Sequence, residues 1–374
     1  MRKNLIAGEG GSVYLLALCG VSVLNSIFFY IMRGRVGSFA GLSVADWVGY
    51  VVTQIAIVLV VYLFSVWRKY DIVAVSKFRP FRNVKQGLLL VPIALCSIVA
   101  FLPLSLLFQA FFSAIGFKGG VAAGNIDFSN PGVYFLALLV IAALPAIGEE
   151  FLMRGTVLPA FTTRGATFGV FVSALLFALM HFNPVQTAYQ FAFGVVLAVV
   201  FLLSGSIVPC VILHFLNNFI TLTITAYIPQ IDAAIAGLGA YNWLTGTVSF
   251  AVGTVVLVIL IYAYYRAGQP KKTNEGYRVV DNGVVFEEYS IYAYADKPAE
   301  KASKAMPVAE FFKSAFRFLA SLFTKHGIAA AERELTVANL DIPYMGKRQP
   351  MFSVWLAIGF AVVYWVISLL QGLL

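Results

Sequence analysis

Val133-Tyr-Phe-Leu-Ala-Leu-Leu-Val-Ile-Ala-Ala-Leu-Pro-Ala-Ile147 is an almost purely apolar run, and the adjacent carboxylates Glu149 and Glu150 come at its end. Such a run is typical of a membrane-spanning helix, where an ionised carboxylate is costly and is kept for a purpose. Two of the three histidines, His181 and His214, also fall within apolar runs. These polar residues within apolar helices are the candidates for a functional site.

The composition of the chain is that of a membrane protein. Of its 374 residues, 60% are hydrophobic and 11% are charged, whereas soluble domains carry about 25% charged residues. Several apolar runs reach the length of about 20 residues that a helix needs to cross a bilayer. The formal net charge is +9. In a protein of this class the excess of basic residues indicates cytoplasmic loops beside anionic lipid, and not a nucleic-acid partner.

We predict an all-α polytopic membrane protein of about nine transmembrane helices, with a small cytoplasmic α+β insert before the last helix. The predicted spans lie near residues 12–32, 45–67, 87–116, 133–161, 166–182, 185–203, 207–228, 243–265 and 351–373. They divide the chain into N-terminal helices, a core that carries the polar residues, one additional helix, the insert and the last helix, with bounds 1–132, 133–228, 229–266, 267–350 and 351–374.

Positive charge indicates which loops are cytoplasmic. The segment 68–86 carries six Lys or Arg residues against one acid, so this segment and, by alternation of the spans, residues 266–350 are expected on the cytoplasmic side. Within the insert, residues 278–286 alternate around Asn282-Gly283, which predicts a β-hairpin. Residues 307–325 have one apolar helical face. This pattern fits either a helix in the membrane interface or a helix that covers the hairpin.

The two glutamates differ in their predicted partners. On a helix, Glu150 and Arg154 are four residues apart, so they share a face and can pair. Glu149 points about 100° away from that face, so it stays free to act as a base. We therefore assign catalysis to Glu149 and support to Glu150 and Arg154. The alternative is a charge cluster at the membrane edge, with Glu149 solvated at a helix end.

The histidines have structural alternatives as well. His181 precedes Asn183-Pro184 and could simply cap a helix end. His214 lies within a predicted span with Asn218 one turn later, so their side chains share a face. Intramembrane polar pairs of this kind can hold helices together.

Depth in the membrane favours a shared site over these alternatives. If the turns at 162–165 and 204–206 lie on one membrane side, Glu149 is about 18 Å and His181 about 22 Å from that side. His214 and Asn218 are then about 12 and 18 Å above the second turn. Independent capping or packing residues have no reason to agree in depth, so we expect the four groups to meet.

These groups match the needs of peptide-bond hydrolysis without a cofactor. Glu149 and His181 can hold and deprotonate a water molecule. His214 and Asn218 can donate hydrogen bonds to the oxyanion that forms when this water attacks a carbonyl. Alternatively, Glu149, His181 and His214 could hold Zn²⁺, although no His-Glu-x-x-His sequence is present. No Gly-x-Ser-x-Gly sequence indicates a serine nucleophile.

Three short motifs on separate predicted spans resemble those of a known family. Glu149-Glu150-Phe-Leu-Met-Arg154 is similar to its Glu-Glu-x-x-x-Arg motif, Phe177-Ala-Leu-Met-His181 to its Phe-x-x-x-His motif, and His214-Phe-Leu-Asn-Asn218 to its His-x-x-x-Asn motif. The family is the type II CAAX prenyl endopeptidase and bacteriocin-processing group (CPBP, or Abi) of intramembrane proteases. The resemblance covers about 133–228, and the ordered set of motifs is specific although each one is short.

The resemblance implies a glutamate-dependent, CAAX-protease-like endopeptidase within a helical membrane bundle. By motif position, Glu149 and His181 would activate the water, while His214 and Asn218 would stabilise the oxyanion. Members were long described as metalloproteases, so a zinc-dependent enzyme is the second choice. The expected partners are the lipid bilayer and a membrane-embedded or membrane-associated peptide or protein, and the expected location is the bacterial plasma membrane.

The rival interpretation belongs to a different class of function. Intramembrane Glu and His residues also form proton paths, so a proton-coupled transporter or a non-catalytic membrane scaffold could use the same side chains. Many transporters of this size contain an inverted internal repeat, and none is evident in this sequence.

Overall fold

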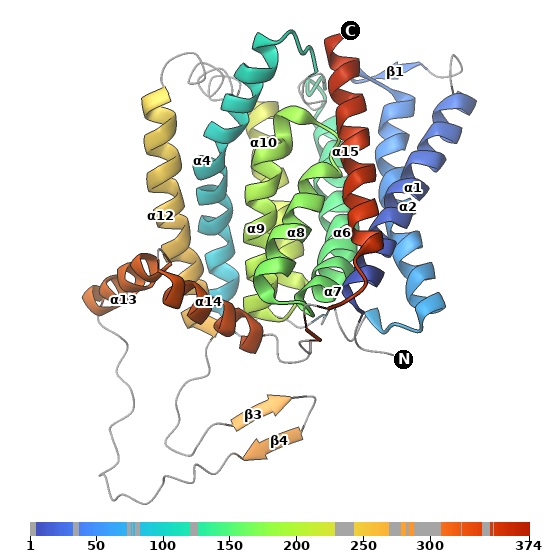
Figure 1. Ribbon diagram of the computed structural model, residues 1–374. Helices are drawn as coiled ribbons and strands as arrows, with labels where there is room; N and C mark the ends of the chain where they lie inside the picture. Colours follow the sequence, from blue (N-terminus) through green and yellow to red (C-terminus); the bar gives the residue numbers. More distant parts are fainter. Residues whose placement is uncertain are drawn as a thin grey trace, which may run out of the picture.

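The computed structural model describes residues 5–32, 37–72, 76, 78, 83–119, 126–228, 243–268, 278–281, 284–287, 308–322, 324–338, 345–346 and 348–374. Within these residues the chain forms a bundle of long helices, with two short hairpins and two further helices at its ends (Figure 1). Eight of the described helical segments are long and apolar enough to cross a membrane. The all-α polytopic membrane fold expected from the sequence is therefore confirmed.

The long helices follow the predicted spans. Their bounds are α1 (Ala7–Met32), α2 (Val44–Arg68), α4 (Val84–Ala114), the irregular helix Pro131–Thr162, η4 (Pro184–Gln186) with α9 (Thr187–Ser204), α10 (Val208–Tyr227), α12 (Trp243–Gly268) and α15 (Phe352–Leu373). Between α1 and α2, the short strands β1 (Ser38–Phe39) and β2 (Leu42–Ser43) pair antiparallel.

The helix that carries the two glutamates is continuous but irregular. It runs through α5 (Pro131–Ala137), the π-helical turn η2 (Leu138–Ala143), α6 (Leu144–Leu152), the π-helical turn η3 (Met153–Val157) and α7 (Leu158–Thr162). Pro145 and Pro159 lie near the starts of α6 and α7, where their missing N–H groups interrupt the regular hydrogen-bond ladder. Such π-helical turns are frequent at functional sites, and here they flank the short helix that bears Glu149 and Glu150.

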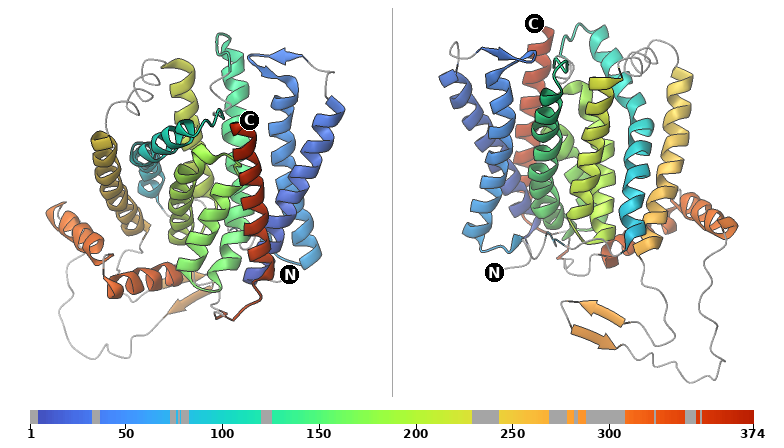
Figure 2. Two further views of the ribbon diagram at one scale, coloured as in Figure 1. Left: turned by 45° about the horizontal axis from the view of Figure 1, so that its top comes forward. Right: turned by 180° about the vertical axis from the view of Figure 1, so that it is seen from behind.

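The fifth predicted span, 166–182, is α8 (Ala166–Leu179), and with 14 residues it is shorter than predicted. It covers about 21 Å, less than the hydrocarbon core of about 30 Å. It packs against α9 as a helical hairpin. The connection between α8 and α9, which contains His181, therefore does not extend as far along the bundle as the ends of α4 and α15 do (Figures 1 and 2).

The long third span is a single crossing. α4 has 31 residues and contains Pro92 and Pro103 without a break in the helix. α12 packs along it at close range because Gly253 has no side chain: a Cβ there would lie 2.8 Å from Ala100 Cα. A single crossing by α4 fixes the alternation of all the helices that follow it.

The last helix is built into the bundle. The Gln349 carboxamide accepts from the Ala7 amide at 2.9 Å and donates to the carbonyl oxygen of Thr163 at 3.2 Å. Further along α15, Trp365 Nε1 donates to Thr187 Oγ1 at 2.7 Å. These bonds tie α15 to α1, to the α7–α8 turn and to the start of α9.

The insert contains the predicted hairpin and helix. β3 (Arg278–Asp281) pairs antiparallel with β4 (Val284–Glu287), and the turn residues Asn282 and Gly283 lie outside the described residues. The helix expected at 307–325 is α13 (Val308–Ser321), and α14 (Lys325–Ala338) follows it.

One face of α13 packs against α12. Tyr262 stacks on Phe318 and forms a hydrogen bond with Ser314 at 2.6 Å. On a neighbouring face, Phe312 and Phe316 are 44% and 52% exposed. The placement of this exposed face in the membrane interface stays a prediction.

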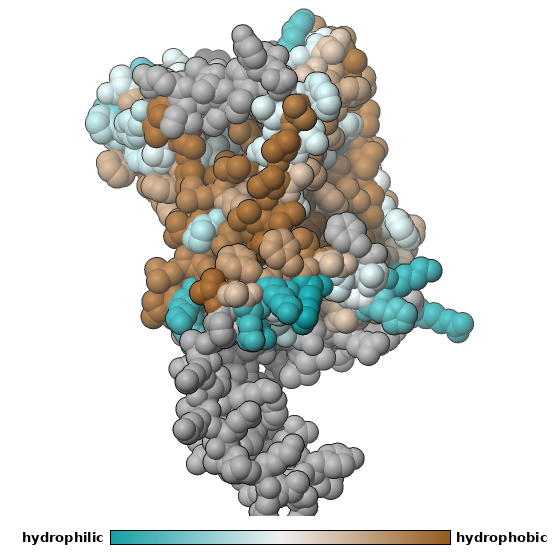
Figure 3. Space-filling model, turned by 90° about the vertical axis from the view of Figure 1, so that its left-hand side faces the viewer, coloured by the Kyte–Doolittle hydropathy of each residue, from teal (hydrophilic) through white to brown (hydrophobic). Residues whose placement is uncertain are grey.

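The surface has the layering of a membrane protein. Figure 3 shows a broad hydrophobic band on the side of α4 and α12, with hydrophilic residues gathered directly below it. Large apolar side chains are exposed on the outward faces, among them Leu88, Leu107 and Val252. In a bilayer such side chains meet lipid instead of water.

Candidate active site

Glu150 is the buried centre of a polar network. It has no exposed surface, and its Oε1 accepts from Arg154 Nη1 at 2.9 Å. The same oxygen lies 2.9 Å from His214 Nδ1. Arg154 Nη2 also donates to the carbonyl oxygen of Gly194 at 3.0 Å. The ion pair expected from the four-residue spacing is therefore present, and it joins the irregular helix to α9 and α10.

The aromatic ring of Phe177 packs against this polar network. The ring is fully buried and meets the rings of His181 and His214 edge-on, with centroid distances of 5.0 and 5.7 Å. The guanidinium carbon of Arg154 lies 4.8 Å from the ring centroid, within the range of a cation–π contact. One aromatic side chain thus packs against both imidazoles and the guanidinium.

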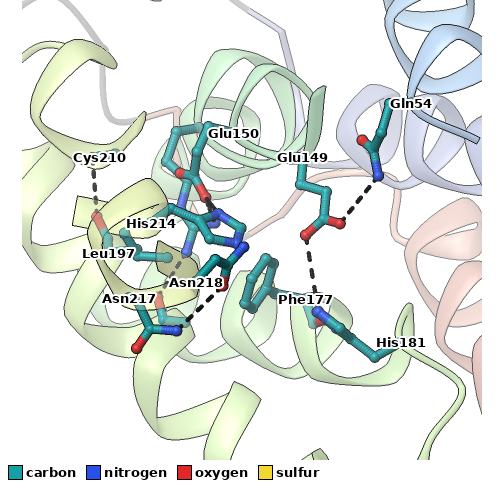
Figure 4. A network of polar contacts seen from close by, with 12 residues as sticks. Gln54, Glu149, Glu150, Phe177, His181, Leu197, Cys210, His214, Asn217 and Asn218 are labelled. Carbon is teal, nitrogen blue, oxygen red and sulfur yellow. Dashed lines mark hydrogen bonds and ion pairs between the residues drawn. The ribbon is translucent and has the colours of Figure 1, made fainter. Parts of the chain in front are cut away.

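Glu149 faces a different set of groups, as its position on α6 requires. Its Oε1 accepts from Gln54 Nε2 at 3.4 Å, and its Oε2 lies 3.9 Å from His181 Nε2 (Figure 4). This Oε2 is buried, with no hydrogen-bond partner among the described residues. Glu149 therefore presents one oxygen to α2 and the other to the imidazole at the end of α8.

The tautomer of His181 follows from its backbone contact. His181 Nδ1 lies 2.8 Å from the carbonyl oxygen of Phe177. A carbonyl oxygen only accepts, so Nδ1 carries the proton, and Nε2 of the neutral imidazole is an acceptor. Two acceptors, Glu149 Oε2 and His181 Nε2, consequently face each other.

Asn218 is held by a chain of hydrogen bonds from α9. The Tyr189 hydroxyl donates to Asn217 Oδ1 at 2.6 Å, and Asn217 Nδ2 donates to Asn218 Oδ1 at 3.3 Å. Since its oxygen is engaged, Asn218 keeps its NH₂ group as a donor. The chain sets the orientation of this carboxamide.

The structure gathers the six predicted residues in one region but divides them into sets. Glu149 lies with His181, whereas His214 lies with Glu150 and Arg154 (Figure 4). The sequence placed His214 on one helix face with Asn218 but did not identify Glu150 as its partner. Its contact with Glu150 shows that this glutamate binds two side chains, those of Arg154 and His214, and not Arg154 alone.

The described structure does not gather the residues considered for zinc into one set of ligands. Within the described part of the chain, no three His, Cys, Asp or Glu side chains are grouped as metal ligands. Of the three zinc candidates, Glu149 and His181 face each other, whereas His214 is bonded to Glu150.

An apolar groove lies between α2 and α6 on the lipid-facing side. Its volume is about 470 Å³, and it is lined by Val51, Gln54, Ile55, Val58, Leu59, Tyr62, Leu144, Ile147 and Gly148. The Gln54 side chain that lines this groove also donates to Glu149. The Gln54 side chain therefore lies between the groove and Glu149.

Residues 131–220 match the family model described as Type II CAAX prenyl endopeptidase Rce1-like. This segment belongs to that family. No curated protein and no solved structure matches the chain. The resemblance based on the three motifs is therefore confirmed, and the Rce1-like segment contains all six predicted residues.

Other residues of the network were not predicted. Gln54 lies outside the Rce1-like segment, but a carboxamide in the middle of the apolar run 45–67 was a signal that could have identified it. Asn217 is adjacent to a motif residue. Tyr189 has no sequence feature that separates it from the other aromatic residues of the spans.

Proposed function

We propose that the chain is a multi-pass membrane endopeptidase of the CAAX-protease type that hydrolyses peptide bonds with an activated water molecule. One observation supports this most: the acceptors Glu149 Oε2 and His181 Nε2 face each other across 3.9 Å. Two acceptors at this separation suit a donor between them, and water can give one proton to each. The lone pairs of that water then point toward a substrate carbonyl.

Glu149 acts as the general base in this scheme. It takes a proton from the water as the water oxygen bonds to the carbonyl carbon, and the carbonyl π electrons move to the oxygen. The same proton then passes from Glu149 to the leaving nitrogen, the C–N bond breaks, and the carboxylate is restored. His181 orients the water through Nε2, and its ring is held by the Phe177 carbonyl.

His214 and Asn218 are assigned to the oxyanion. Asn218 donates from its NH₂ group, the orientation of which is set by Asn217. His214 is bonded to Glu150 through Nδ1, so it can donate from Nε2 only as an imidazolium. The Glu150 carboxylate supplies a counter-charge for that form. Loss of one oxyanion donor typically slows a hydrolase by about 100- to 1,000-fold.

The groove between α2 and α6 indicates the class of substrate. Apolar side chains line it and it opens toward lipid, so it suits an apolar segment of a membrane-embedded or membrane-associated peptide. We assign the enzyme to the bacterial plasma membrane, with the scissile peptide bond placed beside Glu149.

The decisive experiment compares peptide termini in membranes that contain the wild-type protein or Glu149→Gln. New termini that depend on the wild-type protein, and that are equally lost in His181→Ala, are expected. Glu310→Gln, at an exposed carboxylate of α13, is the matched control and should cleave normally.

Two results would contradict the proposal. Identical termini in the wild-type and Glu149→Gln membranes would favour a scaffold. Proton-dependent flux that Glu149→Gln abolishes, without any peptide product, would favour a transporter.

A further inference from the structure

Gln54 is the only group from outside the Rce1-like segment that the described contacts place on the Glu149 carboxylate. It comes from the middle of α2 and is 7% exposed. A carboxamide at this depth in a lipid-facing helix is costly. Its one hydrogen bond among the described residues is the donation to Glu149 Oε1.

The backbone of α6 is shaped to admit this amide. Gly148 immediately precedes Glu149, and a Cβ at Gly148 would overlap Gln54 Oε1. That Oε1 is buried and has no hydrogen-bond partner in the described part of the chain. Where the amide packs against α6, its NH₂ group therefore forms a hydrogen bond, whereas its carbonyl oxygen forms none with the described residues.

The contact distinguishes the two oxygens of Glu149. The terminal torsion of a glutamate is soft, so a carboxylate without fixed partners rotates freely. Gln54 engages Oε1, which leaves Oε2 on the side of His181. Rotation of the group would move Oε2 off the line to His181 Nε2.

We infer that Gln54 is a positioning residue that holds the Glu149 carboxylate in its reactive orientation, with Gly148 providing the space. The inference rests on the proposed endopeptidase function. A purely structural role is the alternative, in which Gln54 joins α2 to α6 as an interhelical hydrogen bond. The two roles differ in what the substitution Gln54→Leu changes.

A positioning role predicts a kinetic loss without a loss of stability. Leu removes a buried acceptor that has no partner, which offsets the lost hydrogen bond, so the melting temperature should stay within about 3 °C. The kcat for a peptide identified from the new termini should fall about tenfold or more because the base is misaligned, while KM changes little.

Gly148→Ala should reproduce this behaviour, because the added methyl group displaces the amide while Gln54 itself remains. The matched control is Thr53→Val, the neighbouring polar residue of α2, which accepts from Asn25 and not from Glu149. It should keep the wild-type kcat.

A second measurement does not depend on cleavage. Infrared difference spectra identify the carboxylate band that is absent from Glu149→Gln, and in Gln54→Leu the frequency of this band should shift because Oε1 has lost its donor. An unshifted band, or a kcat loss that only follows a lower melting temperature, overturns the inference. A shifted band in a protein that cleaves nothing retains the Gln54–Glu149 contact and rejects the endopeptidase function instead.

Discussion

At the scale of single residues, two adjacent glutamates have different partners. Each has one buried oxygen without a hydrogen-bond partner among the described residues, but Glu150 binds Arg154 and His214 through its other oxygen, whereas the free oxygen of Glu149 lies opposite His181. One helix can produce this difference because neighbouring side chains point about 100° apart. This difference supports the proposed division of the two glutamates between support and chemistry.

Glu150→Ala should damage folding more than Glu149→Ala. It leaves the guanidinium of Arg154 buried without its carboxylate, a loss that costs about 3–5 kcal/mol for buried pairs. Yield and thermal melting in detergent measure the difference. The double variant Glu150→Ala/Arg154→Leu should recover part of it, because no unpaired charge is left. Equal stability of the two single variants would contradict the assignment.

Phe177→Leu should reduce cleavage far more than its effect on stability explains. The ring packs against His181, His214 and Arg154, so a smaller side chain loosens both imidazoles. The matched substitution is Phe201→Leu, at a buried position of α9. Both should lower the unfolding free energy by about 1–2 kcal/mol, but only Phe177→Leu should lower kcat. Parallel losses of kcat in the two variants would refute this role.

Chelation separates the water mechanism from the zinc alternative. The described His, Asp, Glu and Cys side chains do not group as metal ligands, so EDTA or phenanthroline should leave the cleavage rate within about twofold. The measurement is the rate before and after dialysis against the chelator. Complete loss of activity that added Zn²⁺ restores would establish the metalloprotease version.

The sequence identified the buried polar side chains and the Glu150–Arg154 pair, but not the other contacts between them. Charged and imidazole groups stand out in an apolar span because burial makes them costly. The partner of His214 depends on how α10 rotates against α6, and no local pattern records that rotation. For the same reason the contact of Gln54 with Glu149 was visible only in the packed helices.

At the scale of elements, the spans were predictable and their irregularities were not. Length and hydropathy located each long helix, since about 20 apolar residues are needed to cross lipid. The π-helical turns beside α6 arise from prolines and local packing, which hydropathy does not register. Hydropathy also did not predict that α8 is short, because the apolar run continues through the turn that follows this helix.

The exposed apolar stripe of α13 should insert into the membrane interface. Phe312 and Phe316 lie on the stripe, while Lys313 and Arg317 are exposed beside it, as in helices that lie on anionic bilayers. Single cysteines at these positions, carrying a fluorophore in vesicles with brominated lipids, measure the depth. Quenching at 312 and 316 that exceeds quenching at 313 and 317 is expected. Equal quenching at all four sites would favour a helix that covers other parts of the insert.

At the scale of the whole molecule, basic residues gather at one end of the bundle. Six of the described ones lie at or beyond helix ends on the side of α13 and α14, at Arg68, Lys69, Lys85, Arg164, Arg266 and Arg348, whereas Lys118 lies at the other end, beside the end of α15. Of the other basic residues that guided the prediction, Lys77, Arg79, Arg82, Lys271 and Lys272 lie outside the described residues. The asymmetry predicts that this end faces the cytoplasm.

The orientation is testable in intact cells. In a background with Cys19, Cys96 and Cys210 replaced by alanine, Ser129→Cys should react with a membrane-impermeant maleimide, because it precedes α5 at the opposite end of the bundle. Lys325→Cys, at the start of α14, should react only after permeabilisation. The single crossing of α4 makes the two outcomes strictly alternative: the reverse labelling pattern would place the insert outside the cell. The route by which a substrate peptide reaches Glu149 would then have to begin from the other membrane face.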